Sequence, residues 1–256
     1  PWAREAGPGR SRLLQSDGDS RQKDDACATA EGKFAGVTQA MLDYYIGLAL
    51  NNNREYYLAT KDVYEREVRA PLLDLAETLA PAALQLDGEM EQRPGHILAR
   101  IRRDTRFTRD KSPYRDHAWL SFRPMGRRKS GSFGLYAALG PQGCCYGAGF
   151  YDEEPARARR IREAILRNPD EFEAALSDPE LRGRFLMLGE DYRRMEPPVA
   201  LPPYADALYR KKGVYFEHDD GLDGRVFSPR YAEEIAEGFR LLRPVYALLA
   251  PLAQGE

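Results

Sequence analysis

The spacing of the apolar residues changes twice along this chain, and that change limits the folds open to it. From residue 38 to about residue 80, apolar side chains recur at helical spacing. Between residues 118 and 151 the pattern becomes that of short strands joined by turns, and helical spacing returns after residue 155. The sequence therefore predicts an α+β fold. We expect a mainly antiparallel sheet of about four or five strands, packed against N-terminal and C-terminal helices.

The helical regions divide at polar and proline residues. Asn51, Asn52 and Asn53 can end one helix and cap the next. Pro71 is expected to kink the third helix near Glu67, and Pro81 to help end it. The pattern predicts helices over residues 38–50, 54–60, 61–80, 155–167, 168–176, a short one from 177, and 228–249.

The predicted strands follow one another closely, which favours an antiparallel meander. Within one of them, Trp119 and Ser121 should face away from Leu120 and Phe122, because successive side chains of a strand point to opposite faces. The same rule separates the neighbouring thiols at residues 144 and 145. The pattern predicts strands over residues 96–101, 118–123, 132–139, 144–151 and 213–218, with a hairpin turn at 140–143.

Composition indicates where folding begins. Residues 1–32 are rich in Gly, Ser, Arg, Asp and Gln, and we predict that they form a disordered leader before a single α+β domain over residues 33–253. No apolar run approaches the roughly 20 residues that cross a bilayer. No apolar segment follows the early arginines as it would in a signal peptide. The sequence predicts a cytoplasmic protein without a membrane partner.

Several well-defined sites are absent from the sequence. Three cysteines and three histidines show no Cys-x-x-Cys and no Cys/His ligand spacing, so no metal site is predicted. There is no phosphate-binding loop, no dinucleotide fingerprint and no Gly-x-Ser-x-Gly elbow. Conventional nucleotide hydrolase, serine hydrolase and zinc protease functions therefore lose their main support, and the sequence names no cofactor.

Positive charge is concentrated between Arg93 and Lys129. This stretch holds ten Arg and two Lys against three Asp, a net charge of +9 in a chain whose total is −2. A local excess of that size favours an anionic partner, because the planar guanidinium group matches carboxylate and phosphate. The alternative is that these cations are neutralised by acidic groups within the fold.

The candidate site lies in the most charged part of this stretch. Its cations would bind a phosphate- or carboxylate-bearing small molecule, and its hydroxyls would add neutral donors. The two carboxylates would orient the cations, or transfer protons if the site is catalytic. The predicted ligand-binding residues are Asn53, Arg54, Arg106, Lys111, Ser112, Tyr114 and Arg115, and the acidic candidates are Asp104 and Asp110.

Two other classes of function remain open at this level. A non-catalytic nucleic-acid-binding module would use Phe107, Tyr114, Trp119 and Phe122, which are interleaved with the basic residues and could stack on bases. The overall pI of about 6.1 argues against that hypothesis. A scaffold protein would instead use the charges only as a structural ion-pair network.

Four strings of residues resemble one family of proteins. They are NNNREYYLATKDVYEREVRAPLLDLAETLAP, RIRRDTRFTRDKSPYRDH, GCCYGAGFY and RKKGVYFEHD, at residues 51–81, 100–117, 143–151 and 210–219. The chain resembles the bacterial and fungal domain of unknown function 2461 over about residues 34–249. The resemblance supports the fold and the position of the site. It implies no activity, substrate or cofactor.

Overall fold

A five-stranded antiparallel sheet organises the part of the chain that the structure describes. The computed structural model describes residues 34–106, 110–127, 131–150 and 152–253. The strands are β1 (Ala118–Phe122), β2 (Phe133–Gly140), β3 (Gly143–Phe150), β4 (Leu186–Leu188) and β5 (Tyr215–Gly221). Their order is β1-β2-β3-β5-β4, and every neighbouring pair is antiparallel. The predicted α+β fold is confirmed.

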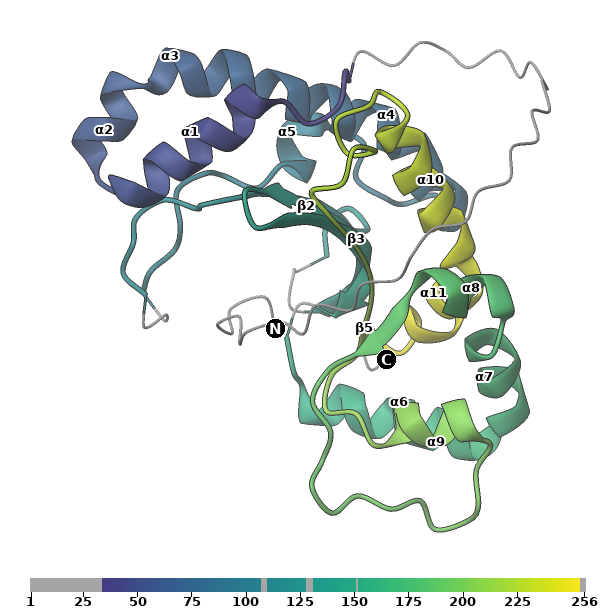
Figure 1. Cartoon of the computed structure of the whole chain (residues 1–256). Coiled ribbons are helices and arrows are strands. Elements are labelled where there is room, and N and C mark those ends of the chain that lie inside the picture. Colours follow the sequence, from purple (N-terminus) through teal and green to yellow (C-terminus); the bar gives the residue numbers. More distant parts are fainter. Residues whose placement is uncertain (1–33, 107–109, 128–130, 151, 254–256) are drawn as a thin grey trace, which may run out of the picture. The chain divides into compact units, whose positions relative to one another are not determined.

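Helices precede, interrupt and follow the sheet in the sequence, and α1, α4 and α10 lie together on one side of it (Figure 1). A short α9 and the strand β4 were not predicted. The predicted leader at residues 1–32 and the candidate stacking residue Phe107 lie outside the described residues. The helices are α1 (Gln39–Leu50), α2 (Arg54–Ala59), α3 (Lys61–Val63), the π-helical segment η1 (Tyr64–Arg69), α4 (Ala70–Leu86), α5 (Pro94–Ile97), α6 (Pro155–Arg167), α7 (Pro169–Leu176), α8 (Pro179–Arg184), α9 (Pro203–Tyr209), α10 (Tyr231–Leu241) and α11 (Arg243–Leu249).

Three prolines, predicted or observed within helices, differ in their effect on the helix. Pro71 lies in the first turn of α4, directly after the π-helical segment, so the expected distortion of the helix is present. The prediction that Pro81 helps to end the helix is wrong, because α4 continues to Leu86. Buried alanines beyond the proline keep packing on the core and outweigh its local cost. Pro244 lies in the first turn of α11, and the predicted C-terminal helix is divided at Leu242.

The predicted strand over residues 96–101 is wrong in its first half. Pro94 starts a single helical turn that ends at Ile97, and only then does the chain become extended. It pairs with the approach to β1 through three backbone hydrogen bonds of 2.8 Å, from Ala99 to Trp119, Arg103 to Pro113 and Arg115 to Ile101. Residues 98–106 and 110–117 therefore form the two arms of an irregular hairpin, called here the basic hairpin.

The sheet has two unlike faces. Leu120, Leu135 and Tyr146 belong to the large core shared with the helices. On the opposite face Trp119 packs with a separate small cluster of Tyr136, Ala138 and Cys145. The predicted alternation along β1 is confirmed by its burial pattern. Cys144 and Cys145 likewise fall in different clusters, so the neighbouring thiols point to opposite faces.

Candidate functional site

Asn52 fixes the basic hairpin to the end of α1. Its Nδ2 donates to the Tyr114 carbonyl oxygen at 3.0 Å, and its Oδ1 accepts from the Tyr114 N–H at 2.9 Å. The Tyr114 ring stacks on Tyr57, with 4.7 Å between ring centroids, and only 7% of the residue is exposed. Tyr114 was predicted to donate to a ligand, but its position is that of a core residue that anchors the hairpin.

The other residues of the α1–α2 junction have local roles. Asn51 Nδ2 donates to the Gly47 carbonyl oxygen at 3.1 Å. Asn53 Oδ1 accepts from the Tyr56 N–H at 2.9 Å and so caps α2. Arg54, in the first turn of α2, is exposed. The amide that reaches the basic hairpin is therefore Asn52, and the predicted ligand residue Asn53 is occupied by capping.

Both candidate carboxylates are held by groups of the hairpin itself. Asp104 accepts from Arg106 Nε and Nη2 at 2.9 and 2.6 Å, and this pairing lowers its pKa to about 2. Asp110 accepts from the Ser112 N–H at 2.8 Å and from Arg103. The Ser112 backbone and hydroxyl, followed by Arg103, lower the pKa of Asp110 to about 2. At neutral pH both carboxyls are ionised and weakly basic, which disfavours a role in proton transfer.

Lys111 also turns back onto the basic hairpin. Its Nζ donates to the Thr105 carbonyl oxygen at 2.8 Å. Arg106 is the more exposed partner of its ion pair, with 76% of its side chain accessible against 57% for Asp104. The two predicted cations are therefore at the surface, with neutral or anionic partners that the hairpin supplies.

Arg115 differs from the other cations of the hairpin. It is half-buried, and its Nε is buried without a hydrogen-bond partner. Within the described residues it forms no ion pair. Burial raises the pKa of the Tyr45 phenol, and the charge of Arg115 opposes that shift, so the two groups are within electrostatic reach. A guanidinium carries five N–H donors, and a buried donor without a partner is costly.

A second unpartnered group lies in the helices that carry the hairpin. The Tyr44 hydroxyl in α1 is buried without a hydrogen-bond partner, and burial raises its pKa to about 12. The Thr60 hydroxyl opposes that shift, but it donates its own proton to the Tyr56 carbonyl oxygen at 2.8 Å. Tyr44 and Asn52 were not among the predicted site residues. Helical spacing places Tyr44 beside the core, but only the packed structure shows that its hydroxyl lacks a partner.

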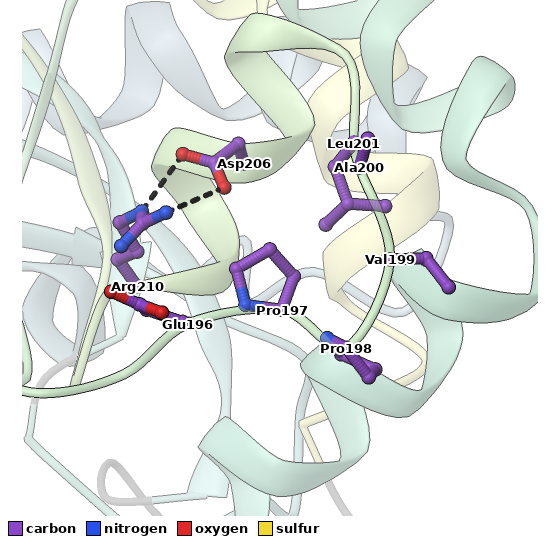
Figure 2. Close-up of a pocket in the computed structure, with 8 residues that line it drawn as sticks. All are labelled: Glu196, Pro197, Pro198, Val199, Ala200, Leu201, Asp206 and Arg210. Carbon is purple, nitrogen blue, oxygen red and sulfur yellow. Dashed lines mark hydrogen bonds and ion pairs between the residues drawn. The ribbon is translucent and has the colours of Figure 1, made fainter.

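A separate pocket of about 400 Å³ lies on the proline-rich connection before α9 (Figure 2). Arg210 donates to Asp206 through Nε at 2.8 Å and Nη2 at 3.0 Å, and its Nη1 donates to the Met195 carbonyl oxygen at 2.9 Å. Its guanidinium is thus engaged in holding the connection against α9. The pocket is lined by Glu196, Pro197, Pro198, Val199, Ala200, Leu201, Asp206 and Arg210, and none of these belongs to the predicted site.

Comparison with known proteins identifies the family. A family model described as a conserved hypothetical protein (DUF2461) matches residues 40–247. The chain belongs to this family. The DUF2461 match includes α1, the basic hairpin and all five strands. No curated protein matches the chain. Among the described residues, no group of three or more His, Cys, Asp or Glu side chains could hold a metal ion, and no helix is long and apolar enough to cross a membrane.

Proposed function

We propose that this DUF2461 protein binds a small anionic ligand, bearing a phosphate or a carboxylate, at Arg115 of the basic hairpin. The buried and unpartnered Nε of Arg115 carries the proposal. Most buried polar atoms in folded proteins have a partner. A planar guanidinium is best satisfied by an oxyanion, because two of its N–H groups can bind two oxygens at once.

The remaining charges of the hairpin support a binding role more than a catalytic one. Asp104 and Asp110 both have a pKa near 2, so neither retains a proton to donate at neutral pH. Arg106 and Arg103 are paired with these carboxylates. Lys111, whose Nζ donates to the Thr105 carbonyl oxygen, is an exposed cation of the hairpin and adds to the attraction for an anion.

The two other hypotheses receive less support. Stacking on nucleic-acid bases needs accessible rings. Tyr114 and Phe122 are buried, and the half-buried Trp119 is stacked on Tyr136. A purely structural ion-pair network would account for Asp104 and Asp110. It gives no role to the charge of Arg115.

The proposal is tested by thermal unfolding of the full chain with inorganic phosphate, pyrophosphate or citrate, at constant ionic strength. A ligand at 100 times its dissociation constant stabilises a protein by about 2.7 kcal/mol. We expect at least one probe to raise the unfolding temperature saturably. Arg115→Gln should abolish that rise, whereas Arg100→Gln, which alters an exposed arginine between the paired residues Ala99 and Ile101 of the same hairpin, should retain it.

An equal response in Arg115→Gln would contradict the proposal, as would the lack of any saturable response. A single-stranded oligonucleotide provides the remaining comparison. If it binds more tightly than every small anion, and its affinity falls steeply with salt, the nucleic-acid hypothesis replaces the small-ligand one.

A further inference from the structure

The guanidinium of Arg162, in α6, is held in place by aromatic rings. Its Cζ lies 5.1 Å from the ring centroid of Tyr192 and 5.9 Å from that of Tyr209. Tyr192 belongs to the connection before α9, and Tyr209 is the last residue of α9, which packs beside α6 (Figure 1). Ring faces attract a cation, but they do not satisfy its N–H groups as an oxygen would. The position of the Arg162 side chain is therefore restricted without an acceptor.

Other arginines of α6 are paired, and Arg162 is not. Arg157 donates to the Glu154 carboxylate at 3.3 Å, and Arg160 donates to two backbone carbonyl oxygens at 3.1 Å each. Within the described residues Arg162 forms no hydrogen bond and no ion pair, not even with the adjacent, exposed Glu163. Its Nη1 is buried without a partner, whereas Nε and Nη2 are not enclosed. The edge of the group that can grip a carboxylate with two parallel N–H bonds therefore remains accessible.

Three further arginines lie close to Arg162 on the same two elements. Arg159 precedes it by three residues on α6, so the two side chains are neighbours on the helix surface. Arg193 and Arg194 directly follow Tyr192. All three are exposed, and none forms an ion pair with a described residue. The two carboxylates just before Tyr192 are paired with lysines that follow α9, so they leave these arginines uncompensated.

We infer that Arg159, Arg162, Arg193 and Arg194 form a docking site for an acidic peptide segment of a partner protein. Arg162 is the anchor, because its side-chain freedom is already restricted and no protein acceptor has to be displaced. Arginine and tyrosine are enriched among the residues that dominate binding at protein interfaces. Exposed ion pairs are individually weak, so a single small anion is held poorly here, whereas several carboxylates on one peptide bind together.

The observations favour a peptide over a nucleic-acid strand. A strand would need ring faces open to its bases. Tyr209 is buried, and Tyr192 is half-buried against Arg162, so these rings serve the guanidinium instead. The docking site goes beyond the proposed function, because it lies on other elements of the fold and takes a different ligand from the anion at Arg115.

The probe is hexaglutamate with a rhodamine label, titrated with the full chain at low salt and followed by fluorescence anisotropy. Hexaglutamine with the same label has the same length and uncharged side chains. We expect hexaglutamate to bind saturably and hexaglutamine to bind at least about tenfold more weakly, a difference of about 1.4 kcal/mol. Arg162→Gln should weaken the binding of hexaglutamate by at least about tenfold as well.

Two matched controls should keep the affinity for hexaglutamate. Arg167→Gln removes an exposed arginine from the last turn of α6. Arg115→Gln disables the proposed small-anion site, so its retained affinity separates this docking site from the proposed function. Peptide binding that is lost in Arg115→Gln and kept in Arg162→Gln would place the peptide at the basic hairpin and overturn the inference.

The double variant Arg193→Gln/Arg194→Gln changes exposed residues only, so it decides the question even if Arg162→Gln does not fold. It should also weaken the binding of hexaglutamate. No saturable binding of hexaglutamate, equal binding of the two peptides, or undiminished affinity in Arg162→Gln or in the double variant would each overturn the inference. So would a thymidine oligonucleotide of equal charge that binds more tightly than hexaglutamate and depends on Arg162, because it would assign the surface to nucleic acid.

Discussion

The basic hairpin and the surroundings of Asp220 show two opposite ways of placing charge in one fold. In the hairpin the charges are dense in sequence, and the Asp104–Arg106 pair joins near neighbours and remains exposed. Asp220 in β5 has 0% of its side chain exposed. It accepts from His218 Nε2 at 2.9 Å, from the Tyr231 hydroxyl at 3.0 Å and from Arg225 Nη2 at 3.3 Å.

The difference shows that charge density in a sequence says little about where electrostatics controls stability. Exposed ion pairs are screened by water and salt, and they give up side-chain freedom when they form. A buried carboxylate has lost its hydration and depends on its protein partners. The scattered residues around Asp220 should therefore matter more for folding than the conspicuous arginines of the hairpin.

The largest expected effect is at Asp220. Replacing it by alanine leaves the His218 imidazole and the buried Tyr231 hydroxyl without their acceptor, and breaking such a buried pair costs about 3–5 kcal/mol. The free energy of unfolding, measured by urea titration, should fall by that amount. Asp104→Ala is the matched control in the hairpin, and it should leave the midpoint of unfolding unchanged. Equal losses of stability at the two positions would contradict the claim that the buried Asp220 matters more for folding than the exposed Asp104.

A smaller loss is expected at Asn52, which anchors the hairpin by a neutral side chain. Asn52→Ala removes both hydrogen bonds to the Tyr114 backbone and leaves that N–H and carbonyl without their partner. Leaving such groups unsatisfied costs about 1–3 kcal/mol. Asn51→Ala, which removes one exposed bond to Gly47, should cost less. A larger effect at Asn51 would show that Asn52 does not anchor the hairpin.

The pH dependence of unfolding tests the charge state of His218. Its Nδ1 lies 2.7 Å from the Arg184 carbonyl oxygen and its Nε2 2.9 Å from Asp220, so both nitrogens face acceptors and the imidazolium is favoured. The hydrogen bond to Asp220 raises the pKa of His218 above 6.5. Between pH 6.5 and the raised folded-state pKa of His218, the folded chain therefore binds more protons than the unfolded chain. The contribution of protonated His218 to stability is thus complete below about pH 6.5 and is lost as the pH rises through the folded-state pKa of His218.

The measurement is a series of urea titrations between pH 6 and pH 9, on the wild type and on His218→Gln. The wild type should lose stability through this range relative to the variant, whose profile lacks the His218 contribution. Parallel profiles for the two proteins would contradict the assignment of a raised pKa.

The smallest expected effect is at Arg106. Its pair with Asp104 is exposed, so Arg106→Ala should leave the free energy of unfolding unchanged within the error of a urea titration. We also expect Arg106→Ala to retain the anion-induced rise in unfolding temperature that Arg115→Gln abolishes. A marked destabilisation would show that the hairpin charges are structurally buried, and would remove the contrast with Asp220.

Much of the fold follows from local patterns. Helical spacing located α1 and α6 to within a residue, and period-two alternation gave the two faces of β1. The failures arose where packing outweighs a local rule. Pro81 does not end α4, because buried alanines follow it, and Pro94 begins a helical turn where apolar residues suggested a strand. The short strand β4 is recognisable only by its pairing with β5.

The sequence by itself determined the elements, the family and the region where positive charge gathers, since each of these depends on residues close together in the chain. The tertiary structure decided which groups are partners. It alone showed that Asn52, among three asparagines, reaches Tyr114, 62 positions away. It also showed that Arg115 of the basic hairpin has a buried nitrogen without a partner, as does Arg162 of α6. Distances between residues remote in sequence are set by how helices and strands pack, and no local pattern encodes them.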